Sequence, residues 1–223
     1  MRLVEPRNPI YWLVKKLIPL VNAIFLGDVH GLEHVPRSGP FIIACNHVSI
    51  PDGWLFANVV ISALDRPIWF VARDDFWATR WWTRTVCSLL PALLIDWRKP
   101  SEVVHNAEHI LSEGGIIGIF PEGTRNTNPD ELMVGKSGVA RMALHTGVPV
   151  LPAGYQGPNI TRFRDVVKHF LITQKKATLR FGEPLQFKKT EGHISSDVLI
   201  GATDDIMRAV ALVAEKKPRL HRL

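Results

Sequence analysis

The chain has 223 residues, 46% hydrophobic and 22% charged, so it is long enough to bury one large core. Its net charge of +6 favours anionic partners, but no arginine-rich tail or zinc-finger spacing indicates a nucleic-acid-binding protein. The two cysteines, Cys45 and Cys87, exclude a disulfide framework or a Cys-x-x-Cys zinc site and fit a reducing compartment.

The first predicted element is an amphipathic segment over residues 9–26, broken at Pro19. Lys15 and Lys16 near its middle exclude a spanning helix, and lysine beside tryptophan and leucine suits an anionic membrane surface. We therefore expect residues 1–30 to be an amphipathic membrane-associating helical segment, with the protein peripheral or monotopic on the cytoplasmic face of a membrane. The alternative is a first helix packed on the domain. The residues that can share the apolar face are Trp12, Leu13, Leu17, Leu20 and Ile24.

Residues 31–223 are expected to form one α/β domain, because short apolar runs alternate with helical patterns. We expect strands over residues 40–46, 66–72, 91–96, 114–121, 148–155 and 176–184. We expect helices over about 51–63, 75–88, 100–113, 136–146 and 198–215. This alternation predicts a mostly parallel central sheet flanked by helices, with ligands at the carboxyl ends of the strands.

The helix expected over residues 75–88 is rich in tryptophan and arginine. Such a composition could mark a patch that faces a membrane, or the rings could fill the core. Both alternatives stay open at this stage. The residues concerned are Trp77, Arg80, Trp81, Trp82 and Arg84.

The stretch "NHVSIPDG" (46–53) directly follows the first buried strand. Pro51 suits the first turn of a helix, and Ser49 and Asp52 have the spacing of a capping box with Ser49 as the N-cap. His47 would then lie on the strand-to-helix loop, where a bend can bring it to Asp52. A histidine oriented by a carboxylate is a general base. Since no Gly-x-Ser-x-Gly is present, the substrate would bring its own hydroxyl.

A second polar cluster, "IFPEGTRN" (119–126), also follows an apolar strand. Gly123 lets the backbone approach a ligand, and Thr124 and Arg125 offer donors, of which the guanidinium can hold a phosphate. Arg98 adds positive charge after a third strand. Because these segments follow successive strands, we expect a shared site for an anionic ligand.

Three other patterns have simpler explanations. "HNAEH" (105–109) matches an inverted zinc-protease motif, but its surroundings indicate an ordinary amphipathic helix. "VGKS" (134–137) lacks the first glycine of a nucleotide-binding loop, so Lys136 would serve a phosphate only as a positive charge. Cys45 could be a thiol nucleophile, but a small apolar residue at the end of a buried strand explains it better.

Several of these segments together resemble one family. "NHVSIPD" resembles the N-H-x-x-x-x-D motif of the glycerolipid acyltransferases, particularly the 1-acyl-sn-glycerol-3-phosphate acyltransferases. "FPEGTR" resembles their third motif and "VPVLPAG" their fourth, and the resemblance runs from about Gly31 to Leu185. Arg98 stands one place later than the arginine of the usual second motif, so Lys99 could share its role.

The resemblance implies transfer of a fatty acyl group from acyl-CoA, or from acyl carrier protein, to the free hydroxyl of lysophosphatidic acid, giving phosphatidic acid. His47 would be the general base and Asp52 would orient it. No cofactor and no metal are implied, and the expected partners are the two substrates and an anionic membrane surface. The implied substrate-binding residues are Arg98, Glu122, Gly123, Thr124, Arg125 and Lys136.

The alternatives concern the acceptor and the presence of turnover. Glycerol 3-phosphate, another lysophospholipid or a glycolipid could be the acceptor, and water would make the protein a hydrolase. A relative that binds lipid without catalysis is a further alternative. The acyl-chain length and the oligomeric state stay open.

Overall fold

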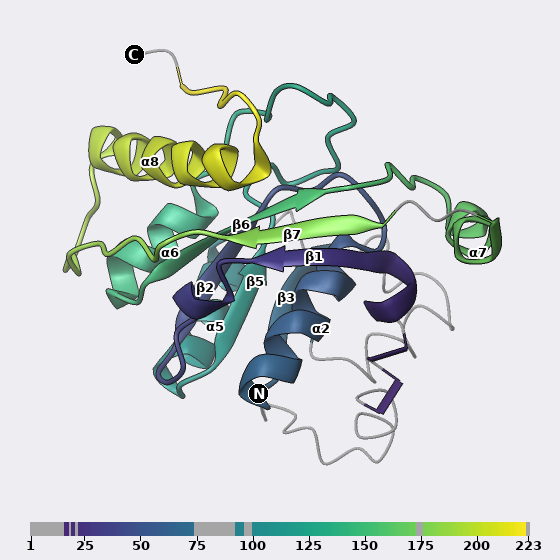
Figure 1. The fold of residues 1–223 in the computed structure, drawn as a ribbon. Coiled ribbons are helices and arrows are strands. Elements are labelled where there is room, and N and C mark those ends of the chain that lie inside the picture. Colours follow the sequence, from purple (N-terminus) through teal and green to yellow (C-terminus); the bar gives the residue numbers. More distant parts are fainter. Residues whose placement is uncertain are drawn as a thin grey trace.

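A computed structural model describes residues 22–73, 92–95, 100–172 and 176–221, together with residues 16, 17, 19 and 20 (Figure 1). Within these residues the centre is a seven-stranded sheet of order β1-β7-β6-β2-β5-β3-β4. The strands are β1 (Leu26–His30), β2 (Phe41–Cys45), β3 (Ile68–Arg73), β4 (Ala92–Ile95), β5 (Ile116–Ile119), β6 (Val150–Gln156) and β7 (Ala177–Phe181). The helices are α2 (Asp52–Leu64), α5 (Pro100–Ser112), α6 (Gly138–Thr146), α7 (Phe163–Ile172) and α8 (Ser196–Ala214), with a 3₁₀ turn η1 (Leu32–His34).

The sheet is mostly parallel, which confirms the predicted fold class. Strands β6, β2, β5, β3 and β4 run in one direction, as expected for strands joined by helices. Among the described strands, only β7 pairs antiparallel, with β6, and β1 then pairs parallel with β7. The six predicted strands are all present with shifted ends.

Strand β1 was not predicted. The chain is strand at Leu26–His30, so the helical segment expected through residue 30 ends earlier than the sequence indicated. Residues 16, 17, 19, 20 and 22–25 are helical, and Leu17 and Leu20 are exposed beside Lys16. Most of the expected amphipathic face, and the helix expected over residues 75–88, lie outside the described residues. The division of the chain at residue 30 and the membrane contact stay predictions.

Both faces of the sheet are covered, and β2 shows this most clearly. All five of its side chains are buried. Ile42 and Ala44 face the core under α5, α6 and α8, whereas Phe41 and Ile43 face the core under α2 (Figure 1). This alternation follows from the two-residue period of a strand. A strand buried on both faces has a continuous apolar sequence. For this reason β2 could be predicted from the sequence.

One described helix differs from expectation. Helix α7 was not predicted, whereas α2 begins at Asp52, close to the predicted start. In Figure 1, α7 lies at the end of β6, away from the other helices. No helix within the described ranges is both long and apolar enough to cross a membrane.

Candidate active site

The two polar segments predicted to form the site meet at one edge of the sheet. Strands β2 and β5 are parallel neighbours, and Ala44 is paired with Ile119. His47 and Glu122 each lie three residues beyond that pair. Parallel neighbours end on the same edge, so the segments that follow them leave the sheet together. The backbone N–H of His47 donates to Oε1 of Glu122 at 3.1 Å, which joins the two segments directly.

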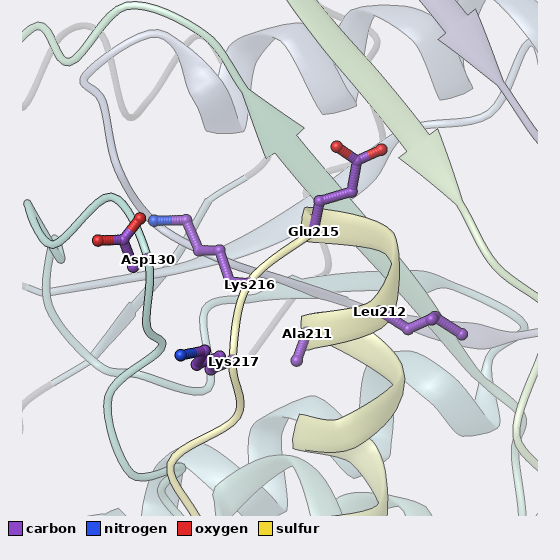
Figure 2. A pocket seen from close by; sticks show the side chains of 6 residues that line it. All are labelled: Asp130, Ala211, Leu212, Glu215, Lys216 and Lys217. Atoms are coloured by element: carbon purple, nitrogen blue, oxygen red, sulfur yellow. The ribbon is translucent and has the colours of Figure 1, made fainter.

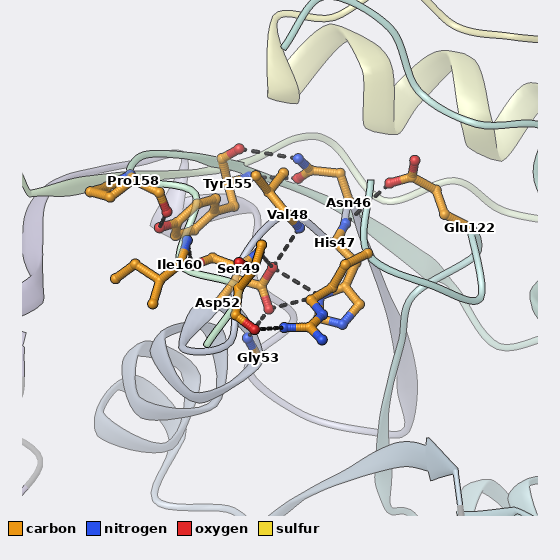
Figure 3. Close-up of polar contacts among 12 residues, drawn as sticks. Asn46, His47, Val48, Ser49, Asp52, Gly53, Glu122, Tyr155, Pro158 and Ile160 are labelled. Carbon is orange, nitrogen blue, oxygen red and sulfur yellow. Dashed lines mark hydrogen bonds and ion pairs between the residues drawn. The ribbon is translucent and has the colours of Figure 1, made fainter. Parts of the chain in front are cut away.

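His47 and Asp52 form the expected pair (Figure 3). The imidazole Nδ1 lies 3.0 Å from Oδ1 and 2.9 Å from Oδ2 of Asp52. A carboxylate accepts hydrogen bonds, so Nδ1 carries the proton in this contact and the neutral ring keeps Nε2 as an acceptor. The Asp52 side chain is fully buried, whereas 22% of the His47 side chain is exposed. The ring can therefore accept a proton from a molecule that reaches it from outside.

The Asp52 carboxylate is fixed by backbone donors. Oδ2 accepts from the N–H groups of Val48 and Ser49 at 2.8 and 2.9 Å, and Oδ1 accepts from Gly53 at 2.6 Å. Hydrogen bonds of this kind stabilise an ionised carboxylate and hold it in one orientation. Asp52 also lies in the first turn of α2, where a negative charge is favourable.

The predicted capping box is half right. The N–H of Ser49 does donate to the Asp52 carboxylate, but the N-cap of α2 is Pro51 and has no side-chain cap. The Ser49 hydroxyl instead accepts from the N–H of Ile160 at 3.0 Å. The prediction of Ser49 as the N-cap was therefore wrong. The prediction failed because the Ser49 hydroxyl binds a residue 111 positions away, and local spacing cannot reveal such a contact.

An aromatic ring packs against His47. The Phe120 ring stacks on the imidazole, with centroids 4.0 Å apart and planes inclined by 19°. The ring of Phe70 contacts that of Phe120, with centroids 5.7 Å apart. Phe120 was not singled out in the sequence, although its place directly before "PEGTR" and after a strand is a usable signal.

Asn46 and Tyr155 extend the sheet behind the site. The Asn46 amide donates to the carbonyl of Tyr155 at 3.1 Å and accepts from its N–H at 2.7 Å. The side chain thus replaces the backbone of β2, which has ended one residue earlier. Burial raises the pKa of the Tyr155 phenol; a hydrogen bond with Ser49 opposes this rise and the charge of Asp52 adds to it. The phenol also donates to the carbonyl of Pro158 at 2.9 Å.

The Glu122 carboxylate points into the protein, with 2% of the residue exposed. Besides the His47 N–H, it accepts from the Asn126 side chain and the Met133 N–H, each at 2.8 Å. Its charge also acts on Lys216, whose pKa is lowered by burial and raised less strongly by Glu122 and Asp130. Asn126 is buried as well and had no predicted role.

The other predicted substrate-binding residues lie around the same loop. Gly123 has φ +70°, and a Cβ there would lie 2.7 Å from Nζ of Lys136, so the lysine passes directly over the glycine. Thr124, Arg125 and Lys136 are exposed. One guanidinium nitrogen of Arg125 donates to the carbonyl of Thr161 at 3.0 Å. The predicted Arg98 lies outside the described residues.

Two alternative chemistries find no support here. Cys45 is completely buried, and burial, with a smaller effect of Asp52, raises the pKa of its thiol well above the usual value. A buried neutral thiol is a poor nucleophile. In "HNAEH", Glu108 contacts His145 on α6, with Oε1 and Nδ1 2.6 Å apart. The part of the chain that the structure describes holds no group of three side chains that could bind a metal ion.

A surface pocket of about 540 Å³ lies at the end of α8 (Figure 2). It contains none of the predicted site residues. Figure 2 shows the Lys216 side chain extending toward Asp130 across the pocket. The lining residues are Asp130, Ala211, Leu212, Glu215, Lys216 and Lys217.

Two sequence relatives of this chain are named as acyltransferases. The chain is 29% identical to a 1-acyl-sn-glycerol-3-phosphate acyltransferase of Bacillus subtilis (strain 168) over 159 residues, which are 70% of this chain and 72% of that protein. It is 30% identical to the human 1-acyl-sn-glycerol-3-phosphate acyltransferase alpha over 129 residues, 56% of this chain and 44% of that protein.

Structural comparison supports the fold independently. The crystal structure of the 1-acyl-sn-glycerophosphate acyltransferase PlsC from Thermotoga maritima matches with a TM-score of 0.59 and 20% sequence identity. The match covers 92% of this chain and 77% of that one. A family model described as Acyltransferase matches residues 27–156, which span β1 to β6 and include both polar segments of the site. The chain therefore belongs to the acyltransferase family.

Proposed function

We propose that the protein transfers a fatty acyl group from an acyl thioester to the free hydroxyl of lysophosphatidic acid, which yields phosphatidic acid. The observation that carries this proposal is the contact of His47 Nδ1 with both oxygens of the buried Asp52 carboxylate. The names of the Bacillus subtilis and human relatives support the choice of acceptor. The thioester is that of acyl-CoA or of acyl carrier protein.

The reaction needs no nucleophile from the protein. Nε2 of His47 takes the proton of the acceptor hydroxyl while Asp52 stabilises the imidazolium that forms. The hydroxyl oxygen attacks the thioester carbonyl, and an ester bond forms as the carbon–sulfur bond breaks. The imidazolium returns its proton to the departing sulfur. The products are phosphatidic acid and a free thiol, and His47 is neutral again.

The acceptor phosphate would bind beside the loop after β5. Arg125 and Lys136 supply exposed positive charge there, and Thr124 supplies a hydroxyl. The close passage of Lys136 over Gly123 keeps the ammonium group next to the backbone of this loop. Arg98 is a further proposed phosphate ligand, on the basis of the sequence alone. No cofactor or metal is proposed.

Membrane contact is part of the proposal. The acceptor is a lipid, and the exposed Leu17 and Leu20 beside Lys16 are suited to an anionic lipid surface. The net charge of +6 would add to this attraction. We propose a peripheral or monotopic location on the cytoplasmic face of a membrane, and flotation with vesicles that do or do not contain anionic lipid would test it.

The test of the reaction is an acceptor panel with radiolabelled acyl-CoA. Lysophosphatidic acid, glycerol 3-phosphate, another lysophospholipid and a glycolipid are compared, with thiol release measured in parallel. Acylated product from lysophosphatidic acid supports the proposal. Preference for another acceptor, or thiol release without acylated lipid, contradicts it. Vesicle binding without thiol release would indicate a lipid-binding relative.

Substitutions at the pair test the mechanism. A general base contributes about 10²–10⁴-fold, so His47→Ala and Asp52→Asn should each lower kcat by about that factor. His145→Ala is a matched control, because His145 forms a similar pair with Glu108 away from the site. Unchanged turnover in His47→Ala would refute the assigned base.

A further inference from the structure

The backbone of His47 is held on both sides by the loop that follows β5. Its N–H donates to Oε1 of Glu122 at 3.1 Å, and its carbonyl accepts from the N–H of Asn126 at 2.7 Å. These contacts join segments 75 or more residues apart in sequence. Both polar groups of the His47 peptide backbone are therefore used by one loop, and the backbone has little freedom to move away from it.

The two holding residues are also bound to each other. The Asn126 side chain donates to Oε2 of Glu122 at 2.8 Å, which closes a ring that runs from His47 through Glu122 and Asn126 back to His47. The same side chain donates to the carbonyl of Glu131 at 2.7 Å, and Met133 donates to Oε2 of Glu122. We call Glu122 and Asn126 the His47 clamp.

The clamp is poorly placed to touch a substrate. Glu122 and Asn126 are 2% and 7% exposed, whereas Thr124 and Arg125 between them are exposed. Both oxygens of the Glu122 carboxylate already accept hydrogen bonds from protein donors. The two ends of this segment, Glu122 and Asn126, thus face the protein, while Thr124 and Arg125 between them face solvent.

We propose that Glu122 and Asn126 are positioning residues that fix the His47 backbone for proton transfer, and that Glu122 is not a ligand of the acceptor headgroup. The inference rests on the proposed function. The side chain of His47 is set by Asp52 and Phe120, and its backbone by the clamp. Reacting groups misplaced by about 1 Å can lose up to about 10²-fold in rate, so a loose His47 backbone lowers kcat rather than affinity.

Two variants separate positioning from binding. Glu122→Gln presents an amide where three donors now meet a carboxylate, so at least one of these hydrogen bonds is lost. Asn126→Ala removes the link to Glu122 and keeps the backbone N–H that holds the His47 carbonyl. Thr127→Ala is the matched control, since Thr127 is an exposed residue of the same loop. Arg125→Ala is the contrasting substrate-binding variant.

Steady-state rates with lysophosphatidic acid in mixed micelles give the first readout. We expect kcat to fall about 10- to 100-fold in Glu122→Gln and about tenfold in Asn126→Ala, with KM for the acceptor within about twofold. Arg125→Ala should raise KM instead. A KM raised more than about fivefold in either clamp variant, whatever its kcat, overturns the proposal, and so does an unchanged kcat in both.

Hydrogen–deuterium exchange of the peptide around residues 44–53 gives a readout that needs no turnover. Exchange should be faster in both clamp variants than in wild type or Thr127→Ala. Glu122→Gln weakens the hydrogen bond of the His47 N–H, and Asn126→Ala removes the side chain that supports Glu122. If wild type does not acylate lysophosphatidic acid, the proposed function fails while this readout still tests the clamp. Unchanged exchange overturns the clamp itself. If thermal melting shows that both variants fail to fold, the proposal is also overturned, because the two residues would then serve the fold as a whole.

Discussion

The imidazole ring of His47 lies flat against the phenyl ring of Phe120, with centroids 4.0 Å apart. Asp52 holds one edge of the same imidazole, so the ring is fixed in its plane by a carboxylate and on its face by an aromatic ring. Stacked pairs of this kind are worth about 0.5–1.5 kcal/mol beyond the area they bury. The arrangement limits rotation of His47 to small angles.

Replacement of Phe120 by leucine should lower kcat about tenfold, because the aliphatic side chain stays apolar but loses the flat surface. Steady-state kinetics at saturating acceptor measure the effect. Phe70→Leu is the control, since Phe70 is a ring neighbour of Phe120 at a centroid distance of 5.7 Å and is not itself the ring stacked on His47. Its kcat should stay within about twofold of wild type, and equal losses in the two variants would contradict a specific role of the stack.

Gly123→Ala should raise KM for lysophosphatidic acid. A Cβ at residue 123 would lie 2.7 Å from Nζ of Lys136, so the lysine must leave its present position. The left-handed backbone adds about 1–2 kcal/mol of strain for a residue with a Cβ. Gly39→Ala separates the two effects, since Gly39 has φ +74° and no heavy atom within 4 Å of the added carbon.

The comparison of the two glycine variants uses thermal melting and kinetics together. Both should be destabilised by a similar amount, and only Gly123→Ala should bind the acceptor more weakly. A KM that rises equally in Gly39→Ala would show that strain alone is responsible and that Lys136 has no part in binding.

Cys45 should be unreactive in the folded protein. Burial raises the pKa of its thiol, so the thiolate that reacts with iodoacetamide is scarce even at pH 8. Mass spectrometry of the Cys45 peptide should show alkylation only after unfolding in guanidinium. Cys45→Ala should keep kcat within about threefold of wild type, since a base-catalysed transfer needs no acyl-enzyme. Complete loss of turnover in this variant would instead indicate a covalent intermediate.

Tyr155 should make the fold sensitive to high pH. The pKa of its phenol is raised in the folded state, so the folded protein keeps the proton to higher pH than the unfolded chain does. The resulting contribution to the free energy of unfolding is fully present below the unfolded pKa of about 10. It is lost as pH rises from there toward the pKa of the folded state.

The measurement is the free energy of unfolding of wild type and Tyr155→Phe at pH 8 and pH 11. The wild type should lose about 1 kcal/mol more than the variant over this interval, because only it carries the titrating phenol at this position. At pH 8 the variant should itself be less stable, by about 1 kcal/mol, since it lacks the hydrogen bond to Pro158. Equal losses with pH in the two proteins would contradict the assignment to Tyr155.

The sequence predicted the parts of the fold that depend on local patterns. Buried strands such as β2 are continuous apolar runs, and the helices between them have a 3.6-residue period. Strand β1 was missed because Leu26 continues the apolar pattern of the preceding helix without an interruption. The antiparallel direction of β7 was also missed, because it depends on how the chain returns to the sheet after α7 and not on the residues of the strand.

In the candidate site, the pair of His47 and Asp52 could be predicted because both residues lie within one strand-to-helix turn. The true partner of the Ser49 hydroxyl and the contact of Glu122 with the His47 backbone could not, since these contacts join residues 111 and 75 positions apart. Glu122 was assigned by resemblance to the headgroup, and its inward orientation became visible only in the folded chain. Distant polar contacts of this kind leave no periodic signal in a single sequence.

The pairing of Ala44 with Ile119 has a consequence for the lengths of the two segments that follow. His47 lies three positions after Ala44, and Glu122 lies three positions after Ile119. A residue inserted or deleted in either segment would shift one of the two by about 3.3 Å along its strand direction, more than a hydrogen bond can tolerate. An insertion between Ala44 and His47, or between Ile119 and Glu122, should thus damage the site. The site is defined by the spacing of its backbone as much as by its side chains.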